Sequence, residues 1–141
     1  MGAVVVIVGL SFYKNKKVFI TGHTGFKGTW LCRILLQAGA EITGFALEPP
    51  TVPSLFVQTK TAQNIRSISG DVRNREALVK AVEEVKPDIL FHLAAQPLVR
   101  LSYREPAATY ETNVMGTVNV LEALRLTPRV RSFVNATTDK V

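Results

Sequence analysis

The sequence has little of the chemistry that builds a disulfide framework or a metal centre. Its 141 residues include one cysteine, Cys32, and two histidines. One cysteine excludes a disulfide within the chain, and the lack of a Cys/His cluster argues against a metal site. Cys32 lies among apolar residues of an expected helix, so we expect a buried, inert side chain. A reducing cytoplasm is the expected compartment.

Long hydrophobic runs are also missing. The run from Ala3 to Leu10 is too short to span a bilayer, and no lysine or arginine precedes it as in a signal peptide. The Met1-Gly2 start lacks Ser or Thr at position 6, which argues against myristoylation. We therefore expect no membrane partner. Residues 1–15 are interpreted as an N-terminal extension: an extra strand, a disordered tail or sequence from a misplaced start.

Acidic residues are scarce relative to basic ones. The chain has 11 Asp and Glu against 17 Lys and Arg, for a formal net charge of +6. Either the basic residues are solvated surface or they favour an acidic partner. Arginines and aromatics are not interleaved as on a nucleic-acid-binding face, so we expect no nucleic acid, and a phosphate-bearing small molecule explains the charge equally well.

A glycine-rich turn is the most informative motif. Val18–Thr21 has the composition of a strand, and an apolar-periodic helix follows with Trp30. Between them lies G-x-x-G-x-x-G, in which Gly22 would make the turn, Gly25 would admit phosphates and Gly28 would let the helix pack on its strand. Such a turn offers backbone N–H groups to the pyrophosphate of a dinucleotide. The spacing differs from G-x-G-x-x-G, and a structural turn without a ligand is the alternative.

The rest of the chain alternates strands and helices. We expect strands over 40–47, 65–68, 89–95 and 130–135, and helices ending near Gly39, between Asn74 and Pro87, and from Pro106 onward. The proline-rich segment 48–54 and the segment 94–103 are expected loops. This order predicts an α/β fold, a Rossmann-type doubly wound parallel sheet, over residues 16–141.

Four polar residues have alternative interpretations. Asp71 follows an expected strand and would either accept from an adenine amino group or serve as a turn residue. Asn113 lies within the last helix and would bond either a loop or a cofactor. His92 is interpreted as a core histidine rather than a base. Glu48 comes late for the acidic residue that holds the adenosine ribose, which leaves the choice between NAD and NADP open.

Eight strings in the chain match known enzymes. Four are general: Thr21-Gly22-x-x-Gly25-x-x-Gly28, Gly70-Asp71-Val72, His92-Leu93-Ala94-Ala95 and Asn113-Val114-Met115-Gly116-Thr117. Four are more particular: His23-Thr24-Gly25-Phe26-Lys27-Gly28, Ala46-Leu47-Glu48-Pro49-Pro50-Thr51, Ala95-Gln96-Pro97-Leu98-Val99-Arg100-x-Ser102-Tyr103 and Thr138-Asp139-Lys140. The general strings resemble the extended short-chain dehydrogenase/reductase family, and the particular ones resemble its CDP-glucose 4,6-dehydratases. The resemblance covers Lys16 to Val141 and corresponds to the N-terminal part of such enzymes, so it implies that the C-terminal part of the family fold is missing.

The resemblance implies an NAD-dependent lyase that converts CDP-glucose to CDP-4-keto-6-deoxyglucose and water. By motif, Thr138 would polarise the C4 oxygen, and Asp139 and Lys140 would serve the elimination; an exposed ion pair is the alternative for these two. Arg100 would lie near the substrate or on the surface. The residues that the resemblance assigns to NAD are Gly22, His23, Thr24, Gly25, Phe26, Lys27, Gly28, Asp71, Val72, Leu93, Ala94, Ala95, Gln96, Asn113 and Thr137.

The resemblance also implies residues that this chain does not contain. The family's Tyr-x-x-x-Lys, which supplies the base for the oxidation step, is expected some tens of residues after Thr138-Asp139-Lys140. We therefore expect the 141-residue chain to be inactive alone. The alternatives are another NAD(P)-dependent epimerase or reductase, and a non-catalytic dinucleotide-binding fragment. A homo-oligomer is plausible for the intact enzyme.

Overall fold

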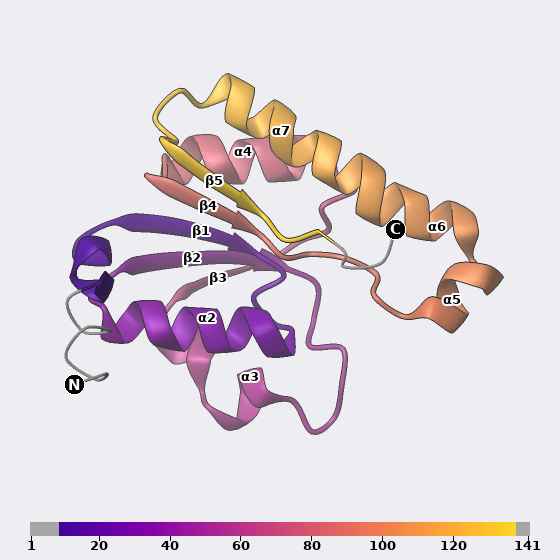
Figure 1. Cartoon of the computed structure of the whole chain (residues 1–141), viewed down its shortest axis with the longest axis horizontal. Coiled ribbons are helices and arrows are strands. Elements are labelled where there is room, and N and C mark those ends of the chain that lie inside the picture. Colours follow the sequence, from indigo (N-terminus) through magenta and orange to yellow (C-terminus); the bar gives the residue numbers. More distant parts are fainter. Residues whose placement is uncertain (1–8, 138–141) are drawn as a thin grey trace.

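Five short strands form one parallel sheet in the computed structural model, which describes residues 9–137 (Figure 1). The strands lie side by side in the order β3-β2-β1-β4-β5, and every neighbouring pair is parallel. Because the order reverses between β1 and β4, the carboxyl ends of these two strands flank the crevice in which ligands of such sheets bind. The strands are β1 (Lys17–Thr21), β2 (Glu41–Ala46), β3 (Arg66–Ser69), β4 (Ile89–His92) and β5 (Ser132–Asn135).

Helices cover both faces of the sheet, which confirms the predicted doubly wound α/β fold. Helix α2 (Phe26–Gln37) lies on one face, and α4 (Arg75–Val85) and α7 (Gly116–Leu126) lie side by side on the other (Figure 1). The shorter elements are η1 (Ser11–Tyr13), α3 (Leu55–Gln58), η2 (Thr61–Gln63), α5 (Val99–Arg104), α6 (Pro106–Tyr110) and η3 (Glu111–Met115), the last a single π-helical turn.

The ends of the long helices follow the sequence. Gly39 has a φ of +80° just past α2, as the predicted C-terminal glycine. The Asn74 side chain accepts from the Ala77 N–H at 3.1 Å and caps α4. Helix α4 ends before Pro87.

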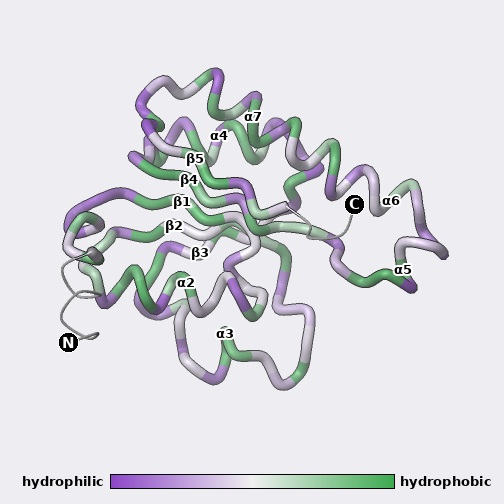
Figure 2. Tube along the Cα trace, in the orientation of Figure 1, coloured by the Kyte–Doolittle hydropathy of each residue, from purple (hydrophilic) through white to green (hydrophobic). Residues whose placement is uncertain are grey.

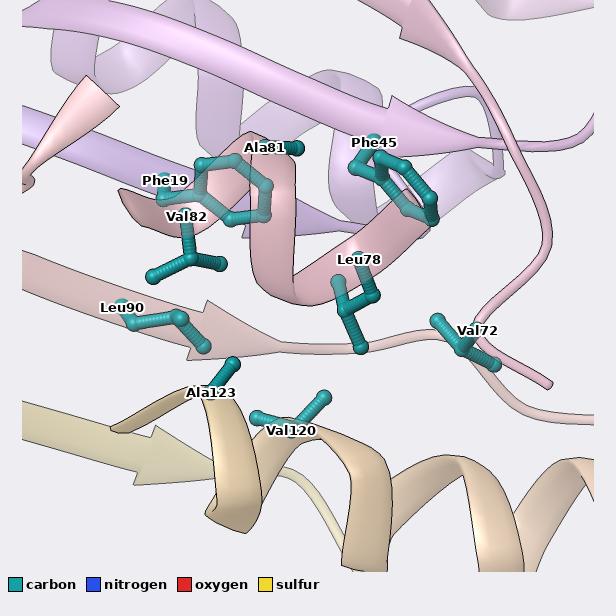
Figure 3. Close-up of a cluster of buried hydrophobic side chains, with 9 residues drawn as sticks. All are labelled: Phe19, Phe45, Val72, Leu78, Ala81, Val82, Leu90, Val120 and Ala123. Carbon is teal, nitrogen blue, oxygen red and sulfur yellow. The ribbon is translucent and has the colours of Figure 1, made fainter. Parts of the chain in front are cut away.

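The core has two parts because strand side chains alternate between the faces of the sheet. Phe19, Phe45 and Leu90 point toward α4 and α7 (Figure 3), whereas Val18, Ile20 and Ile42 pack against Cys32 and Leu35 of α2. The central strands are accordingly mostly hydrophobic in Figure 2. Cys32 is fully buried, as expected, and burial raises the pKa of its thiol to about 12.

Some sequence-based expectations are wrong. The strand expected over 89–95 ends at His92, after which the N–H groups of Leu93 and Ala94 bond the Thr21 hydroxyl. The segment 94–103 is not all loop, because α5 begins at Val99. This helix ends at Arg104, and the next residue, Glu105, has a φ of −130° because Pro106 restricts the residue that precedes it. Helix α2 begins at Phe26, earlier than the apolar pattern indicated, and Trp30 and Ile34 of that pattern are exposed.

Residues before β1 pack against the sheet domain. Tyr13 contacts the core on the α2 side, and the Asn15 N–H donates to the Gly39 carbonyl at 2.9 Å. Across residues 9–137, no helix has the length and apolar character needed to cross a membrane. The same residues contain no cluster of three or more His, Cys, Asp or Glu side chains that could hold a metal ion.

Candidate dinucleotide-binding site

The N-terminus of α2 is open at the carboxyl edge of the sheet. Gly25 is the N-cap residue in an extended conformation, and no side chain in the described part of the chain caps the helix. The first N–H groups of an α-helix have no partner within the helix, so here they are available to a ligand. The first turn contains no acidic residue but does contain the exposed Lys27, although a cation opposes the helix dipole at this end. An anion bound here would satisfy the N–H groups and offset the lysine charge.

The three glycines of the turn meet different surroundings. Gly22 has a φ of +75°, and a Cβ there would lie 2.7 Å from the Ala94 nitrogen. A Cβ at Gly28 would lie well under 3.0 Å from the Gly22 carbonyl oxygen. At Gly25 an added Cβ would come within 4 Å of one heavy atom among the described residues outside its immediate chain neighbours, the same Gly22 oxygen, at 3.5 Å, which is an ordinary contact. The fold itself therefore requires glycine at 22 and 28, whereas at 25 the missing side chain leaves space in front of the helix, which fits a dinucleotide pyrophosphate.

The other residues of the turn lie on different sides. The Thr24 hydroxyl donates to the Leu47 carbonyl at 2.9 Å and joins the turn to the end of β2, next to the exposed Glu48. Phe26 is exposed beside the helix N-terminus. The side chain of His23, in contrast, is fully buried behind the turn and contacts β3. Any contact of His23 with a dinucleotide would come from its backbone.

Asp71 lies at the carboxyl end of β3, on the same edge of the sheet, and its carboxylate already has a partner. It accepts from the Arg73 N–H at 2.9 Å and from the Arg73 guanidinium at 2.6 and 2.9 Å. These bonds hold the pKa of Asp71 below its usual range. Arg73 was not predicted as part of this site. Val72 packs in the core, so only its backbone is available to a ligand.

The segment after β4 is held by a chain of polar residues. His92 is buried; its Nδ1 lies 2.6 Å from the Thr21 hydroxyl and its Nε2 lies 3.1 Å from the Thr117 hydroxyl. The Thr21 hydroxyl also accepts from the N–H groups of Leu93 and Ala94, each at 3.2 Å. Burial lowers the pKa of His92, so the ring is neutral and structural, in line with its interpretation as a core histidine.

Asn113 contacts the same segment from the helical side. Its Oδ1 accepts from the Gln96 N–H at 2.7 Å and its Nδ2 donates to the Gln96 carbonyl at 3.1 Å. The Gln96 side chain turns back to Leu98 and Thr109. Of the two sequence alternatives for Asn113, the structure shows the bond to a loop. Asn113 lies in the π-helical turn η3, a feature frequent at functional sites.

The remaining predicted residues lie farther along this edge or beyond the described residues. Arg100 is exposed on α5 and, with Leu98, Val99, Leu101 and Arg104, lines a shallow apolar hollow of about 400 Å³. Ala95 and Thr137 are exposed, Thr137 shortly after β5. Thr138, Asp139 and Lys140 lie outside the described residues. The structure thus brings the glycine turn, Asp71 and the segment Leu93–Gln96 to one edge of the sheet.

Comparisons with known proteins agree with this arrangement. A family model described as GDP-mannose 4,6 dehydratase matches residues 19–141. The CDP-glucose 4,6-dehydratase of Salmonella typhimurium is 49% identical over 134 residues, which are 95% of this chain and 37% of that enzyme. This relative confirms the resemblance drawn from the motifs.

Solved structures show the same fold. The epimerase Mth375 of Methanothermobacter thermautotrophicus superposes with a TM-score of 0.85 at 27% identity, over 99% of this chain and 40% of that one. The UDP-glucose 4-epimerase of Thermus thermophilus, solved with NAD, gives 0.75 at 29% identity, over 86% of this chain and 37% of that one. The chain therefore spans 37–40% of the length of these relatives. It belongs to the GDP-mannose 4,6-dehydratase family of sugar-nucleotide enzymes.

Proposed function

We propose that residues 16–141 form the NAD-binding domain of a sugar-nucleotide 4,6-dehydratase whose substrate is CDP-glucose. The observation that carries the proposal is the uncapped N-terminus of α2 behind Gly25, where the chain leaves room for a pyrophosphate. The 49% identity to a CDP-glucose 4,6-dehydratase supports the substrate, and the NAD-containing relative supports the cofactor. A protein that uses such a nucleotide sugar is expected in the cytoplasm.

Each part of the site has a role in this proposal. The N–H groups of Phe26, Lys27 and Gly28 bind the pyrophosphate, and the free face of the Asp71 carboxylate accepts from the adenine. The backbone of Leu93, Ala94 and Ala95 lies beside the nicotinamide ribose, held there by Thr21 and Asn113 through Gln96. Thr137 lies at the same edge after β5. Arg100 contacts the substrate.

The chemistry divides between this chain and its continuation. When bound, NAD would supply a reversible hydride acceptor for the sugar. Thr138 polarises the C4 oxygen. In the elimination, a base of the intact enzyme takes the C5 proton, Asp139 donates a proton to the departing C6 hydroxyl so that water leaves, and Lys140 serves the same step. The tyrosine base that accepts the C4 hydroxyl proton lies beyond Val141. Residues 1–141 therefore bind the cofactor without turning over substrate.

The test is a product assay on the intact reading frame. The enzyme, supplied with NAD, is incubated separately with CDP-glucose and GDP-mannose, and proton NMR follows the C6 signal. We expect a 6-deoxy-4-keto product from CDP-glucose at least 100-fold faster than from GDP-mannose, and none from the Asp139→Asn variant. A 4-epimer without loss of water would favour an epimerase instead.

A homo-oligomer is also part of the proposal. An apolar stripe of Tyr110, Val114, Val118 and Leu121 follows the helical spacing of α6, η3 and α7, and all four residues are exposed. A continuous apolar stripe of this kind is unusual on a monomer and fits the same stripe of a second copy.

A further inference from the structure

The side chain of His23 in the glycine turn is buried and makes specific contacts. The His23 side chain is 0% exposed, its Nε2 lies 2.7 Å from the Ser67 hydroxyl of β3, and its ring meets the Phe56 ring edge-on at 5.3 Å between centroids. Polar side chains of a turn normally reach solvent, since burial costs them hydration. Here the turn sends its one histidine inward, between the sheet and α3.

The neighbouring strand leaves space for this ring. Gly44 lies in the middle of β2, where glycine weakens a strand and marks a close approach by another group. A Cβ at Gly44 would lie well under 3.0 Å from three atoms of the His23 ring. Because Gly44 has no side chain, the His23 ring packs directly against the β2 backbone, and this contact fixes the position of the ring.

The backbone of His23 contacts the first turn of α2 and fixes its position. The His23 carbonyl accepts from the Thr29 hydroxyl at 3.1 Å, and an added Cβ at Gly28 would lie 2.8 Å from the His23 Cα. One residue thus joins the β2–β3 side of the sheet, through its ring, to the first turn of α2, through its backbone. The open N–H groups of that turn are the proposed pyrophosphate site.

The His23 ring does this at a cost to the fold. Its fully buried Nδ1 has no hydrogen-bond partner of ordinary geometry in the described part of the chain, although an interaction of the ring with the Phe45 backbone offsets part of the lowering of its pKa by burial. A buried polar atom without a partner destabilises a fold, and an apolar side chain at position 23 would avoid that cost. A polar ring here is explained if its bond to Ser67 orients the turn.

We propose that His23 is a positioning residue for dinucleotide binding, which orients the N–H groups of Phe26, Lys27 and Gly28 without touching the ligand. The proposal rests on the proposed function for the identity of that ligand. Gly44 and Ser67 share this role, because Gly44 leaves the space that the His23 ring occupies and Ser67 forms the hydrogen bond to the ring. The side chain of His23 acts on binding only through the turn.

A double-mutant cycle in the 141-residue chain tests this. His23→Ala, Gly44→Ala and the double variant are titrated with NAD by calorimetry, with Gly9→Ala as the control, because a Cβ at Gly9 meets no atom of residues 9–137 within 4 Å. We expect each single variant to raise the Kd at least 10-fold, the double variant to match His23→Ala within about twofold, and Gly9→Ala to leave the Kd unchanged. Losses that multiply in the double variant would overturn the role of the ring against Gly44.

A conservative variant separates positioning from mere stability. In His23→Gln the side-chain amide reaches Ser67, so the Kd should stay within about threefold of the wild-type value, and Ser67→Ala should raise it by a similar factor to His23→Ala. If all variants lose thermal stability while their folded fraction binds NAD with the wild-type Kd, His23 is only structural.

A ligand-free measurement distinguishes this inference from the proposed function. If the wild-type chain does not bind NAD, the cofactor assignment fails, and nitrogen-15 order parameters of residues 25–28 decide the inference. They should fall from about 0.85 in the wild type to below about 0.6 in His23→Ala, with those of α4 unchanged. Equal values in the two proteins would contradict the positioning role whatever NAD does.

Discussion

At the scale of single residues, the fold requires Gly22 and Gly28, whereas Gly25 leaves space for a ligand. A methyl group at Gly28 would press on the Gly22 carbonyl oxygen, which is backbone and has little room to move. We predict that Gly28→Ala lowers the free energy of unfolding by about 2 kcal/mol or more. Urea denaturation with the Gly9→Ala control measures this. A loss below about 0.5 kcal/mol would show that α2 does not pack against the turn as described.

The two histidines make stability depend on pH. Burial lowers the pKa of His23 to about 4 and also lowers the pKa of His92, whereas an unfolded histidine titrates near 6.5. The unfolded chain therefore binds more protons in this range, so the free energy of unfolding is highest above pH 6.5 and falls as the pH falls toward 4. Hydrogen bonds from Arg73 lower the pKa of Asp71, and those from the Lys17 N–H and Arg129 lower the pKa of Asp88, so the stability these carboxylates contribute is lost only as the pH falls below their unfolded pKa of 3.8.

Urea midpoints at pH 7 and pH 5 check this prediction. We expect a lower midpoint at pH 5, and a smaller difference between the two pH values for His23→Gln. Equal midpoints for the wild-type chain would mean that the histidines are not buried in the neutral form.

Residue-level roles were only partly predictable from the sequence. The three glycines were each given their role from spacing, and those of Gly22 and Gly28 agree with the contacts found. The inward direction of His23 was not foreseen, because motif matching assigns a residue to a site without saying which way its side chain points. Gly44 in mid-strand was the available signal. The bond between Arg73 and Asp71 could not be predicted from the sequence, because it depends on the conformation of the turn after β3.

At the scale of elements, Asn113 in η3 ties a helix to the segment after β4. Alanine at this position removes both hydrogen bonds to the Gln96 backbone. We predict that Asn113→Ala lowers the free energy of unfolding by about 1–3 kcal/mol and speeds hydrogen exchange at the Gln96 amide. Val52→Ala, at a fully exposed valine, should change stability by less than about 0.5 kcal/mol. Similar results for both variants would contradict a stabilising role of the two hydrogen bonds between Asn113 and the Gln96 backbone.

Elements with strong local signals were predicted well. The caps at Asn74 and Gly39 and the stop at Pro87 agree with the structure because each depends on neighbouring residues alone. Helix α5 was missed because its one and a half turns have no cap or long apolar period. Likewise, Trp30 and Ile34 follow the apolar period of α2 but are exposed, since within the described residues the sheet covers only the side of α2 that carries Cys32 and Leu35.

At the scale of the whole molecule, the parallel sheet with helices on both faces agrees with the sequence pattern, but the exposed apolar surface does not follow from that pattern. The stripe of Tyr110, Val114, Val118 and Leu121 is exposed, and the edge strand β5 has Val134 exposed. Periodicity shows that a helix has an apolar face, but not what covers that face. This chain spans 37–40% of its relatives' length, and no segment among residues 9–137 covers the stripe of Tyr110, Val114, Val118 and Leu121.

The exposed stripe predicts self-association of the 15.5 kDa chain. Sedimentation should show a mass of two chains or more that falls on dilution, and Val118→Glu with Leu121→Glu should shift the equilibrium to single chains. Val52→Glu, at a fully exposed valine away from the stripe, is the control and should change nothing. A concentration-independent single chain would contradict the stripe as an interface.

The most direct test of the central claim is a calorimetric titration of the 141-residue chain with NAD, beside its Gly25→Asp variant. Aspartate is a good N-cap residue and has room at position 25, so the variant should be at least as stable as the wild type, while its carboxylate repels a pyrophosphate. We predict saturable binding by the wild type, with a stabilisation of about 2.7 kcal/mol at 100 times the Kd, and none by the variant. Wild-type and variant chains that bind NAD equally, or a folded wild type that does not bind it, would contradict a dinucleotide site at the N-terminus of α2.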